Sequence, residues 1–457
     1  MGGLGWSVGN WKSDYRLDLP RLSAGEKEVI LAVAERFRAL SQRLEMESGQ
    51  KAREEIARLL SGHLREQGID ADEEQQAYLS ELIFLQTFGL GFLEKLLSDP
   101  SLEEIAVIGL GRPVFVFVRG AGWKRTNVSI DSPEYFVSLA NRLGRGLGRR
   151  LTSQNPRLNA MLEDGSRLHA TMPPVSGCEI TIRKFTRDPL SPFDLLSFGT
   201  WGAKGLSLLS LALQSDLSVL FCGNTASGKT STLNALLSFV PSSERLLLIE
   251  ETPEISVPHP HQLRLIPFEE GGIGMVDLVR DSLRMRPDKV AVGEVRTQGE
   301  ARAFAESALS GQAKGCYATF HAQSSRDALL RLRMMGCLDA DLEGLDLFVV
   351  QRRVSAYDAS RRSLGEKRRL AEISLMDRKD ALCPITVFDG RRFSQKGLSL
   401  FLERISEAGG MSLREAKGEF SKRESFISEG AKGRRANFED SFWKIQGFMF
   451  GKAGRRA

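Results

Sequence analysis

The stretch GNTASGKT, residues 223–230, has the spacing GxxxxGK(S/T) of a phosphate-binding loop. An apolar run at 217–222 precedes it and a helix-like run follows it, which is the context that the motif requires. Its glycines let successive N–H groups turn inward, and the following helix directs its N-terminal dipole at the same anion. Lys229 is placed to neutralise phosphate charge, and the Thr230 hydroxyl to ligate Mg²⁺. The predicted nucleotide contacts are Gly223, Asn224, Thr225, Ala226, Ser227, Gly228, Lys229, Thr230 and Ser231. The loop therefore predicts a bound nucleoside triphosphate, but not what its hydrolysis drives.

Carboxylates end two predicted strands that follow the loop. Glu250 and Glu251 stand in LLLIEETPEI, with Glu254 a little further on, and Glu294 stands in KVAVGEVR. Phosphoryl transfer needs acidic groups for the metal and for the attacking water, and open α/β sheets bind ligands at the carboxyl ends of their strands. We therefore expect all but Glu254 to be catalytic, and Glu294 and Glu251 to join Thr230 as metal ligands. Surface glutamates also commonly close strands, and the residue types alone do not say which carboxylate orients water.

A histidine ends the next apolar strand, in YATFHAQSS. A lone histidine in such a place is often a core residue or a helix cap. Because His321 is expected beside the same sheet edge as the phosphate loop, it is also a candidate sensor of the γ-phosphate.

The rest of the chain supplies the elements that must hold these groups. Residues 1–71 read as a helical N-terminal segment, and 72–185 as an α+β domain, because helical spacing gives way to alternating strands. Residues 186–204, with prolines and no sustained period, read as a linker. Strands and helices then alternate over 205–400, which predicts an α/β domain with a parallel sheet flanked by helices. The last part, 401–457, reads as a helix and a weakly ordered basic tail.

Composition favours a soluble globular protein of two or three domains. The chain has 457 residues, of which 42% are hydrophobic and 26% charged. No apolar run approaches the roughly 20 residues of a membrane-spanning helix, and the first residues lack a signal-peptide pattern, so we expect a cytoplasmic protein. Five cysteines without metal-binding spacing indicate reduced thiols. A net charge of +5 does not by itself favour nucleic acid as a partner.

Four segments in this order resemble the motifs of the secretion ATPase superfamily, which serves type II and type IV secretion and type IV pilus assembly. GNTASGKT resembles its Walker A loop, LLLIEETPEI its acidic "Asp box", RMRPDKVAVGEVR its Walker B strand ending in glutamate, and ATFHAQSSRDALLRL its "His box". The stretch from DGSRLHATMPP to the linker is similar to the second N-terminal domain of the family. The resemblance covers about residues 95–375. The sequences of the segments TASGKTSTLNAL and IEETPEI are most similar to those of the archaeal branch, which powers archaella and pili.

The resemblance implies that the α/β domain over 205–400 is a RecA-like P-loop motor domain. It further implies ATP and Mg²⁺ as ligands, Glu294 as the carboxylate that orients water, and His321 as a nucleotide sensor. It also implies that Arg167 and Arg183 reach the nucleotide of a neighbouring subunit, although either alone would read as a solvated strand residue; Arg286 and Arg296 are weaker candidates. The family forms homo-hexamers in which nucleotide binding closes the two domains. We therefore expect a polytopic membrane platform protein as partner, pilin-like or secreted subunits as indirect partners, and a peripheral position at the inner face of the membrane.

The chain departs from the family pattern at three places. Asn224 stands where a glycine is usual, Gly311-Gln312 replaces a Gly-His pair, and TQGEA is one residue longer than usual. These departures leave open a nucleotide-gated scaffold that does not hydrolyse ATP. The basic C-terminal residues leave open a nucleic-acid-handling NTPase, although the Phe and Trp residues among them fit a docking helix at a membrane or platform protein equally well, and nucleic acid is not the expected partner.

Overall fold

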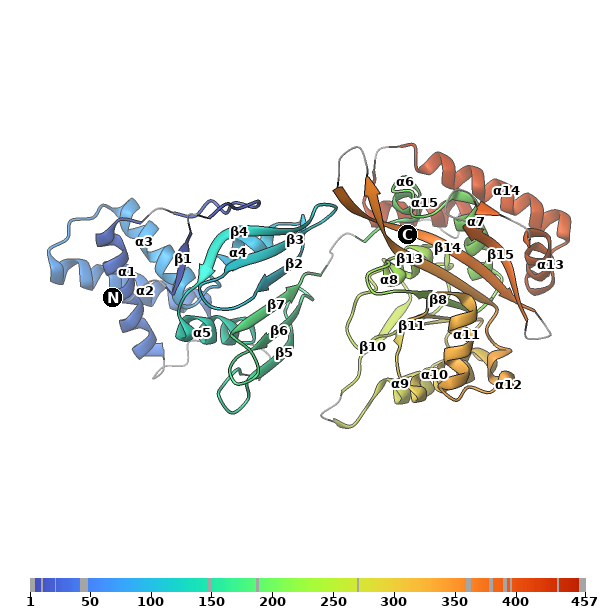
Figure 1. Cartoon of the computed structure of the whole chain (residues 1–457), viewed down its shortest axis with the longest axis horizontal. Helices are drawn as coiled ribbons and strands as arrows, with labels where there is room; N and C mark the ends of the chain where they lie inside the picture. Colours follow the sequence, from blue (N-terminus) through green and yellow to red (C-terminus); the bar gives the residue numbers. More distant parts are fainter. Residues whose placement is uncertain are drawn as a thin grey trace. The chain divides into compact units, whose positions relative to one another are not determined.

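The computed structural model describes residues 5–9, 11–20, 22–41, 48–145, 150–185, 189–268, 271–358, 363–377, 381–388, 393–394, 397–433 and 435–451. The chain divides into two compact units, Met1–Thr186 and Arg187–Ala457 (Figure 1).

Three helices of the first unit pack together around an apolar core. They are α1 (Ala24–Ser41), α2 (Gly49–Gln67) and α3 (Glu73–Thr87). Ser48 caps the start of α2 by accepting from the backbone N–H of Lys51, and Gly68 ends it in the left-handed conformation with φ 65°. Leu79 and Ile83 of α3 lie in one core with Val33 and Ile56. The boundary that we expected between 71 and 72 therefore cuts through this cluster, because long-range packing of α3 leaves no local sequence signal.

The first unit also contains an antiparallel sheet. Its strands among the described residues are β1 (Trp6–Val8), β2 (Leu102–Val107), β3 (Pro113–Val118), β4 (Gly122–Ile130), β5 (Arg157–Met161), β6 (Arg167–Thr171) and β7 (Glu179–Arg183), in the order β1-β4-β3-β2-β7-β6-β5. α4 (Leu93–Ser98) and α5 (Pro133–Leu143) contribute Leu96 and Phe136 to its core. Ser132 caps α5, and Pro133 occupies its first turn. The predicted α+β fold of this part of the chain is confirmed.

A mixed sheet forms the centre of the second unit. Its strands in the described ranges are β8 (Val219–Gly223), β9 (Leu246–Ile249), β10 (Gln262–Leu265), β11 (Lys289–Val295), β12 (Gly315–Phe320), β13 (Leu347–Asp358), β14 (Ser363–Met376), β15 (Leu382–Phe388) and β16 (Phe393–Ser394). The order is β10-β9-β11-β12-β8-β13-β14-β15-β16. Pairing is parallel from β10 to β13 and antiparallel beyond β13. The predicted parallel sheet is confirmed, whereas the strands β10 and β13 were missed.

Helices cover both faces of this sheet, and its strands β8, β9 and β12 are buried along their whole length (Figure 1). Val219 and Phe221 of β8 lie in one core, and Leu220 and Cys222 in the other, as the two-residue period of a strand requires. The first core is built with α6 (Pro192–Ser197), α7 (Ala203–Gln214), α8 (Lys229–Leu236), η1 (Leu237–Phe239), α13 (Leu398–Gly409), α14 (Leu413–Gly430) and α15 (Phe438–Phe450). The second is built with α9 (Met275–Ser282), α10 (Gln298–Leu309), α11 (Ser325–Met334) and α12 (Asp339–Leu342).

The last part of the chain differs from the weakly ordered basic tail that we expected. α14 and α15 are full helices, and Phe438, Phe442 and Ile445 are buried in the core of the sheet. Gln446 donates from Nε2 to the carbonyl oxygens of Ser238 and Val240, both at 2.8 Å. These aromatic residues therefore hold α15 to η1 and do not form a free docking face. Residues 452–457, which carry part of the basic tail, lie outside the described residues.

The expected linker is also more ordered than its prolines suggested. Ser191 caps α6 in a capping box with Asp194, and Phe193 and Trp201 pack into the core of the second unit. Residues 186–188 lie outside the described part. Over the described residues, no helix combines the length and apolar character needed to cross a membrane.

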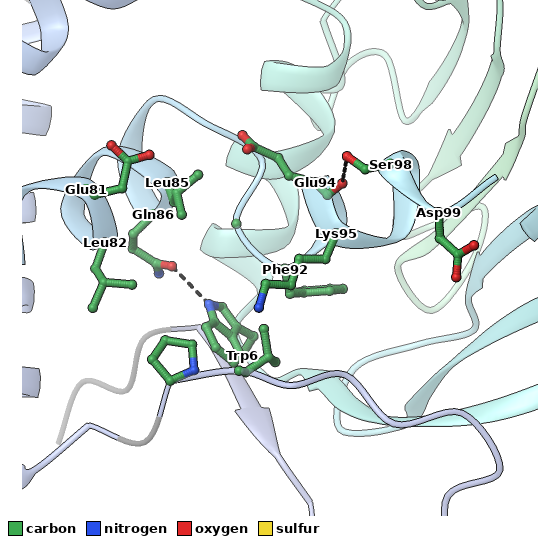
Figure 2. Close-up of a pocket in the computed structure, with 13 residues that line it drawn as sticks. Trp6, Glu81, Leu82, Leu85, Gln86, Phe92, Glu94, Lys95, Ser98 and Asp99 are labelled. Atoms are coloured by element: carbon green, nitrogen blue, oxygen red, sulfur yellow. Dashed lines mark hydrogen bonds between the residues drawn. The ribbon is translucent and has the colours of Figure 1, made fainter. Parts of the chain in front are cut away.

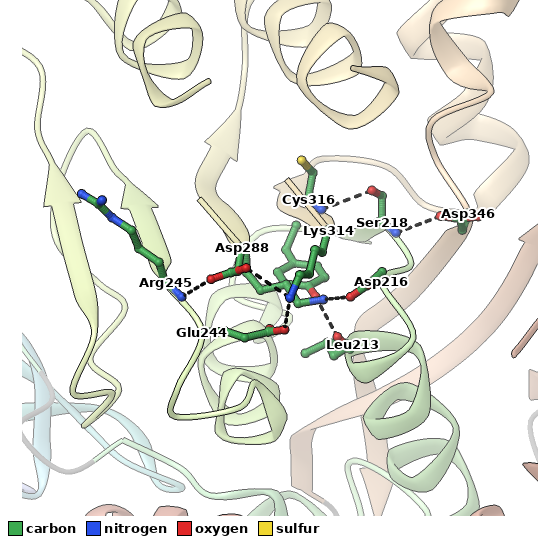
Figure 3. A network of polar contacts seen from close by, with 11 residues as sticks. Leu213, Asp216, Ser218, Glu244, Arg245, Asp288, Lys314, Cys316 and Asp346 are labelled. Atoms are coloured by element: carbon green, nitrogen blue, oxygen red, sulfur yellow. Dashed lines mark hydrogen bonds and ion pairs between the residues drawn. The ribbon is translucent and has the colours of Figure 1, made fainter. Parts of the chain in front are cut away.

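A polar network ties together the edge of the sheet at which its parallel strands begin (Figure 3). Lys289, fully buried, places Nζ 2.6 Å from Oδ1 of Asp216. Lys314 reaches Glu244 at 3.0 Å and Asp288 at 3.2 Å. Because these residues start or precede different strands, the network fixes the strand positions from the edge opposite the phosphate loop.

Candidate nucleotide site

The phosphate loop joins β8 to α8 in a conformation that its glycines permit. A β-carbon on Gly223 would lie 2.2 Å from the carbonyl oxygen of Gln351, so no larger residue fits there. Gly228 has φ 94° and is the residue before α8. No side chain of the described residues caps this helix. The N–H groups of its first turn therefore remain available to an anion.

The side chains of the loop fit a bound phosphate. Lys229 is buried, and its Nζ donates to the carbonyl oxygen of Gly223 at 3.3 Å. Ser227 is fully buried, and its Oγ has no hydrogen-bond partner among the described residues. Thr230 is half-buried, whereas Thr225 and Ser231 are exposed. A buried ammonium and an unpaired hydroxyl beside a helix N-terminus suit a phosphate chain.

Asn224, which replaces the usual glycine, has a structural task. Its Nδ2 donates to the carbonyl oxygen of Arg353 at 3.1 Å, and its Oδ1 accepts from the backbone N–H of Arg353 at 2.9 Å. The side chain thereby extends the pairing between β8 and β13 by one step. The departure from the family pattern ties the loop to β13.

Gln351 of β13 makes a second tie. Its Nε2 donates to the carbonyl oxygen of Ser227 at 2.7 Å, and its Oε1 accepts from the hydroxyl of Thr232 at 2.7 Å. The Nε1 of Trp201 donates to the same hydroxyl at 3.3 Å. Sequence reasoning missed Gln351, although a polar residue inside the apolar run LFVVQ was a usable signal, since buried glutamines need partners.

Glu294 lies between a histidine and an arginine at the same sheet edge. Its Oε1 is 2.8 Å from Nε2 of His321, and its Oε2 is 2.6 Å from Nε of Arg296. Arg296 also forms an ion pair with Glu251. The structure thus brings together Glu294, His321 and Glu251, as expected, and adds Arg296 as the group that links the two glutamates.

The environment of His321 keeps its imidazole neutral. Burial lowers the pKa of His321 below its usual value, and the ammonium of Lys229 acts in the same direction, against the opposing effect of Glu294. A carboxylate can only accept, so the contact with Glu294 requires a proton on Nε2. Arg331 donates to the carbonyl oxygen of His321 and holds its backbone. His321 and the phosphate loop follow the carboxyl ends of two neighbouring parallel strands, β12 and β8.

Glu250 occupies a different environment from its neighbour Glu251. It is 1% exposed, and its Oε1 accepts from the backbone N–H groups of Glu254 and Ile255, both at 2.9 Å. Its Oε2 lies 3.2 Å from Nε of Arg264 on β10. Burial raises the pKa of Glu250, against its N–H donors and Arg264. These contacts fold the segment after β9, so we now propose a positioning role for Glu250 in place of direct catalysis.

The oxygen atoms around the loop also fit Mg²⁺. This ion usually keeps several waters and takes few protein ligands beside the phosphates, and the Thr230 hydroxyl is such a ligand. Both oxygens of Glu294 contact His321 or Arg296, and Glu251 is paired with Arg296. In the described part of the chain, no group of three or more His, Cys, Asp or Glu residues could hold a metal. The site therefore suits a metal carried in with the phosphates.

Arg167 and Arg183 lie in the first unit, on neighbouring strands. They are direct cross-strand partners of β6 and β7, and Glu104 of β2 faces Arg183 from the other side. Burial raises the pKa of Glu104, while Arg183 acts to lower it. As direct cross-strand partners, the two arginines lie on the same face of the sheet.

A separate pocket of about 560 Å³ lies in the first unit (Figure 2). Trp6 donates from its indole to Oε1 of Gln86 at 2.9 Å beside the buried ring of Phe92. Glu81 and Asp99 line it too, but Glu81 is paired with Arg53, and the carboxylate of Asp99 accepts from the hydroxyl of Tyr15. These carboxylates are thus already engaged within the unit.

The sequence of the chain is similar to that of a known protein family. The family described as "Type II/IV secretion system protein" matches residues 148–400, which is more than half of the chain. The chain belongs to this family. Its archaeal-like branch is supported by two uncharacterized proteins of Methanocaldococcus jannaschii, 38% identical over 234 residues and 36% identical over 267 residues. These matches cover 48% and 57% of this chain, and 32% and 48% of the relatives. The chain thus spans only about a third to a half of their length.

Three further matches cover a larger share of the other protein's own length. The type IV secretion system protein VirB11 of Brucella suis is 31% identical over 284 residues, covering 54% of this chain and 76% of that protein. Among solved structures, the VirB11 ATPase of Brucella suis, in complex with sulphate, has 25% identity and a TM-score of 0.31, covering 62% of this chain and 91% of that one. The ATPase DotB of Legionella pneumophila has 17% identity and a TM-score of 0.47, covering 75% and 89%.

Proposed function

We propose that this chain hydrolyses Mg²⁺–ATP as one subunit of a ring-shaped motor that powers a secretion system, a type IV pilus or an archaellum-like filament. The observation that carries the proposal is the contact between Glu294 and His321 at the carboxyl ends of β11 and β12, beside the end of the parallel strand β8 that leads into the loop with Lys229. A scaffold that only binds nucleotide would not need a carboxylate held between two donors.

Each group of the site has a role that its contacts support. Lys229 and the first-turn N–H groups of α8 bind the phosphates, and Thr230 ligates the metal. Bound Mg²⁺ would neutralise developing charge on the phosphate oxygens. Glu294 orients the attacking water and accepts its proton, while His321 holds one carboxylate oxygen and senses the state of the site. Arg296 forms ion pairs with both Glu294 and Glu251 and holds the two carboxylates in a fixed relative position.

The motor proposal extends to a site shared between subunits. Head-to-tail interfaces generate rings. Arg167 and Arg183, paired on β6 and β7, would then bind the nucleotide of the next protomer of a homo-hexamer. Closure and reopening of the two units around the segment near 186–204 would transmit work to a polytopic membrane platform protein at the inner membrane face, and through it to pilin-like or secreted subunits.

The direct test is ATP turnover by the purified chain. We expect Mg²⁺-dependent hydrolysis, abolished in Lys229→Ala and retained in Lys204→Ala, which removes an exposed lysine of α7. Normal turnover in Lys229→Ala would overturn the assignment of the loop. Stimulation by DNA that disappears with salt would favour the nucleic-acid alternative.

The shared site needs a test of its own. Mixing Arg183→Ala with Lys229→Ala subunits should restore part of the activity, because some interfaces then combine an intact arginine with an intact loop. Size-exclusion chromatography would first establish that both variants assemble. Absence of rescue at every mixing ratio, with assembly intact, would refute arginines that act across the interface.

A further inference from the structure

A two-stranded ribbon continues past the phosphate loop. β13 pairs with β8 as far as Gln351, opposite Gly223. Beyond this point β13 remains paired with β14, with Arg352 opposite Arg369 and Arg353 opposite Arg368. Four arginines therefore occupy two successive cross-strand pairs of the ribbon, directly beyond the loop. The ribbon formed by β13 and β14 can be followed in Figure 1.

The two pairs face opposite sides of the ribbon. Gln351 points at the loop, since its Nε2 donates to Ser227, and its strand partner Leu370 lies in the core with α7 and α8. By the two-residue period, Arg353 and Arg368 share that face. Arg352 points the other way, where it donates from Nε and Nη2 to the carbonyl oxygen of Gln323.

Arg368 reaches the start of the nucleotide-binding helix. Its Cδ lies 3.8 Å from the point where a β-carbon on Gly228 would stand, and Gly228 immediately precedes α8. The side chain of Asn224 makes two hydrogen bonds with the backbone of Arg353, which attach the loop to the ribbon. The fold therefore holds the Arg368 side chain beside the start of α8.

The described residues balance the charges at this point only in part. Like charges directly opposite on paired strands repel. Arg353 has a counter-charge in Glu366, at 3.6 Å from Nη1. For Arg368, the described residues provide neither an ion pair nor a side-chain hydrogen bond. Together with Lys229 and the positive end of α8, this leaves a site that an anion would stabilise.

We propose that Arg368 binds the phosphate chain of the nucleotide held by the loop of its own subunit, with Arg353 as its support. This inference rests on the proposed nucleotide site and names a contact in addition to the loop and the arginines of the neighbouring subunit. A guanidinium presents paired N–H groups that match phosphate oxygens. Asn224 then has a further consequence, because it sets the distance between the loop and the ribbon that carries this arginine.

The test compares ligand binding by calorimetry at 150 mM salt, on the order of physiological ionic strength. ATP and inorganic tripolyphosphate are titrated, each with Mg²⁺, into the wild type, Arg368→Gln and Lys367→Gln. Lys367 is the matched control, an exposed cation of the same strand on the opposite face. We expect Arg368→Gln to weaken both ligands about tenfold, Lys367→Gln to change either less than twofold, and Arg368→Lys to recover part of the loss.

The outcomes separate this inference from the proposed function. If the wild type binds ATP, Lys229→Ala does not, and Arg368→Gln binds as the wild type does, the arginine contact is wrong while the nucleotide site stands. A loss for ATP alone, with tripolyphosphate unaffected, would also overturn it, because the arginine would then act on the base or ribose. An equal loss of affinity in Lys367→Gln would also contradict the inference, because the effect of Arg368 would then come from the positive charge of the strand and not from a contact with the phosphates. A wild type that binds neither ligand would refute the proposed function itself.

Discussion

The imidazole Nε2 of His321 lies 2.8 Å from Oε1 of Glu294. Because β11 and β12 are parallel neighbours, their carboxyl ends bring the carboxylate of one strand against the histidine of the next. The pairing fixes the rotamer of Glu294 from one side, and Arg296 fixes it from the other.

The first prediction concerns this contact. His321→Ala should lower kcat for ATP hydrolysis by about ten- to a hundredfold, with nucleotide affinity changed less than threefold, because the histidine orients the carboxylate more than it holds the ligand. His261→Ala, at an exposed histidine near β10, is the control and should behave as the wild type. An unchanged kcat in His321→Ala would separate the histidine from the chemistry.

A second prediction distinguishes two adjacent glutamates by stability. Glu250→Ala leaves the buried N–H groups of Glu254 and Ile255 without their acceptor, which should cost about 2–4 kcal/mol. Glu251→Ala, at an exposed position, should change stability by less than about 0.5 kcal/mol. Thermal unfolding of the two variants measures the difference. Equal midpoints would show that Glu250 does not hold the segment after β9.

The third prediction is a pH dependence at the opposite sheet edge. Burial acts to raise the pKa of Asp288, but the backbone N–H of Arg245 and the ammonium of Lys314 outweigh it and hold the pKa below its usual value. A depressed carboxyl pKa stabilises the fold above the usual value, roughly pH 4, and this stability is lost as the pH falls through the folded-state pKa. Wild type should therefore exceed Asp288→Asn by about 1–2 kcal/mol from pH 5 to 7, and this gap should close below about pH 4.

Urea unfolding of both proteins across this pH range provides the measurement. A gap that stays constant down to pH 3, or widens there, would contradict the assigned direction of the shift, since protonation of Asp288 removes its advantage over asparagine.

The fourth prediction tests the packing of the last helix. Phe442→Ala removes a fully buried ring and should destabilise the second unit by about 3–5 kcal/mol. Phe448, 40% exposed, stacks on Phe426 with ring centroids 3.9 Å apart, so Phe448→Ala should cost about 1 kcal/mol. Proteolysis of the C-terminal region should accelerate in the first variant only. Similar resistance in both would restore the view of this part as a loosely attached tail.

Local spacing was sufficient to predict the loop and the strand ends that carry Glu294 and His321. A motif such as GNTASGKT constrains its own backbone, and an apolar strand delivers its last residue to the sheet edge wherever the neighbouring strands lie. The roles of Glu250 and Glu251 could not be assigned in this way. The two residues are adjacent in sequence, yet one is enclosed by a turn and the other paired with an arginine 45 positions away.

Contacts between distant segments explain what was missed. Asn224 looked like a defect of the loop because its partner, Arg353, is separated from it by 129 positions. The aromatic residues of α15 left a docking helix open as an interpretation because they stand among basic residues, whereas the structure buries Phe438 and Phe442 in the core. β13 was overlooked because its apolar first half and arginine-rich second half do not share one pattern.

In the function that we propose, Glu294 activates the water that attacks ATP. The most direct measurement compares the wild type with Glu294→Gln in Mg²⁺-ATP hydrolysis and, in parallel, in ATP binding. We predict that the variant binds ATP within about threefold of the wild type while its turnover falls by about 10²–10⁴-fold, because glutamine keeps the size of the side chain and one accepting oxygen but cannot take up a proton. Wild-type turnover in Glu294→Gln, or no hydrolysis by an assembled wild type that binds Mg²⁺-ATP, would contradict the account.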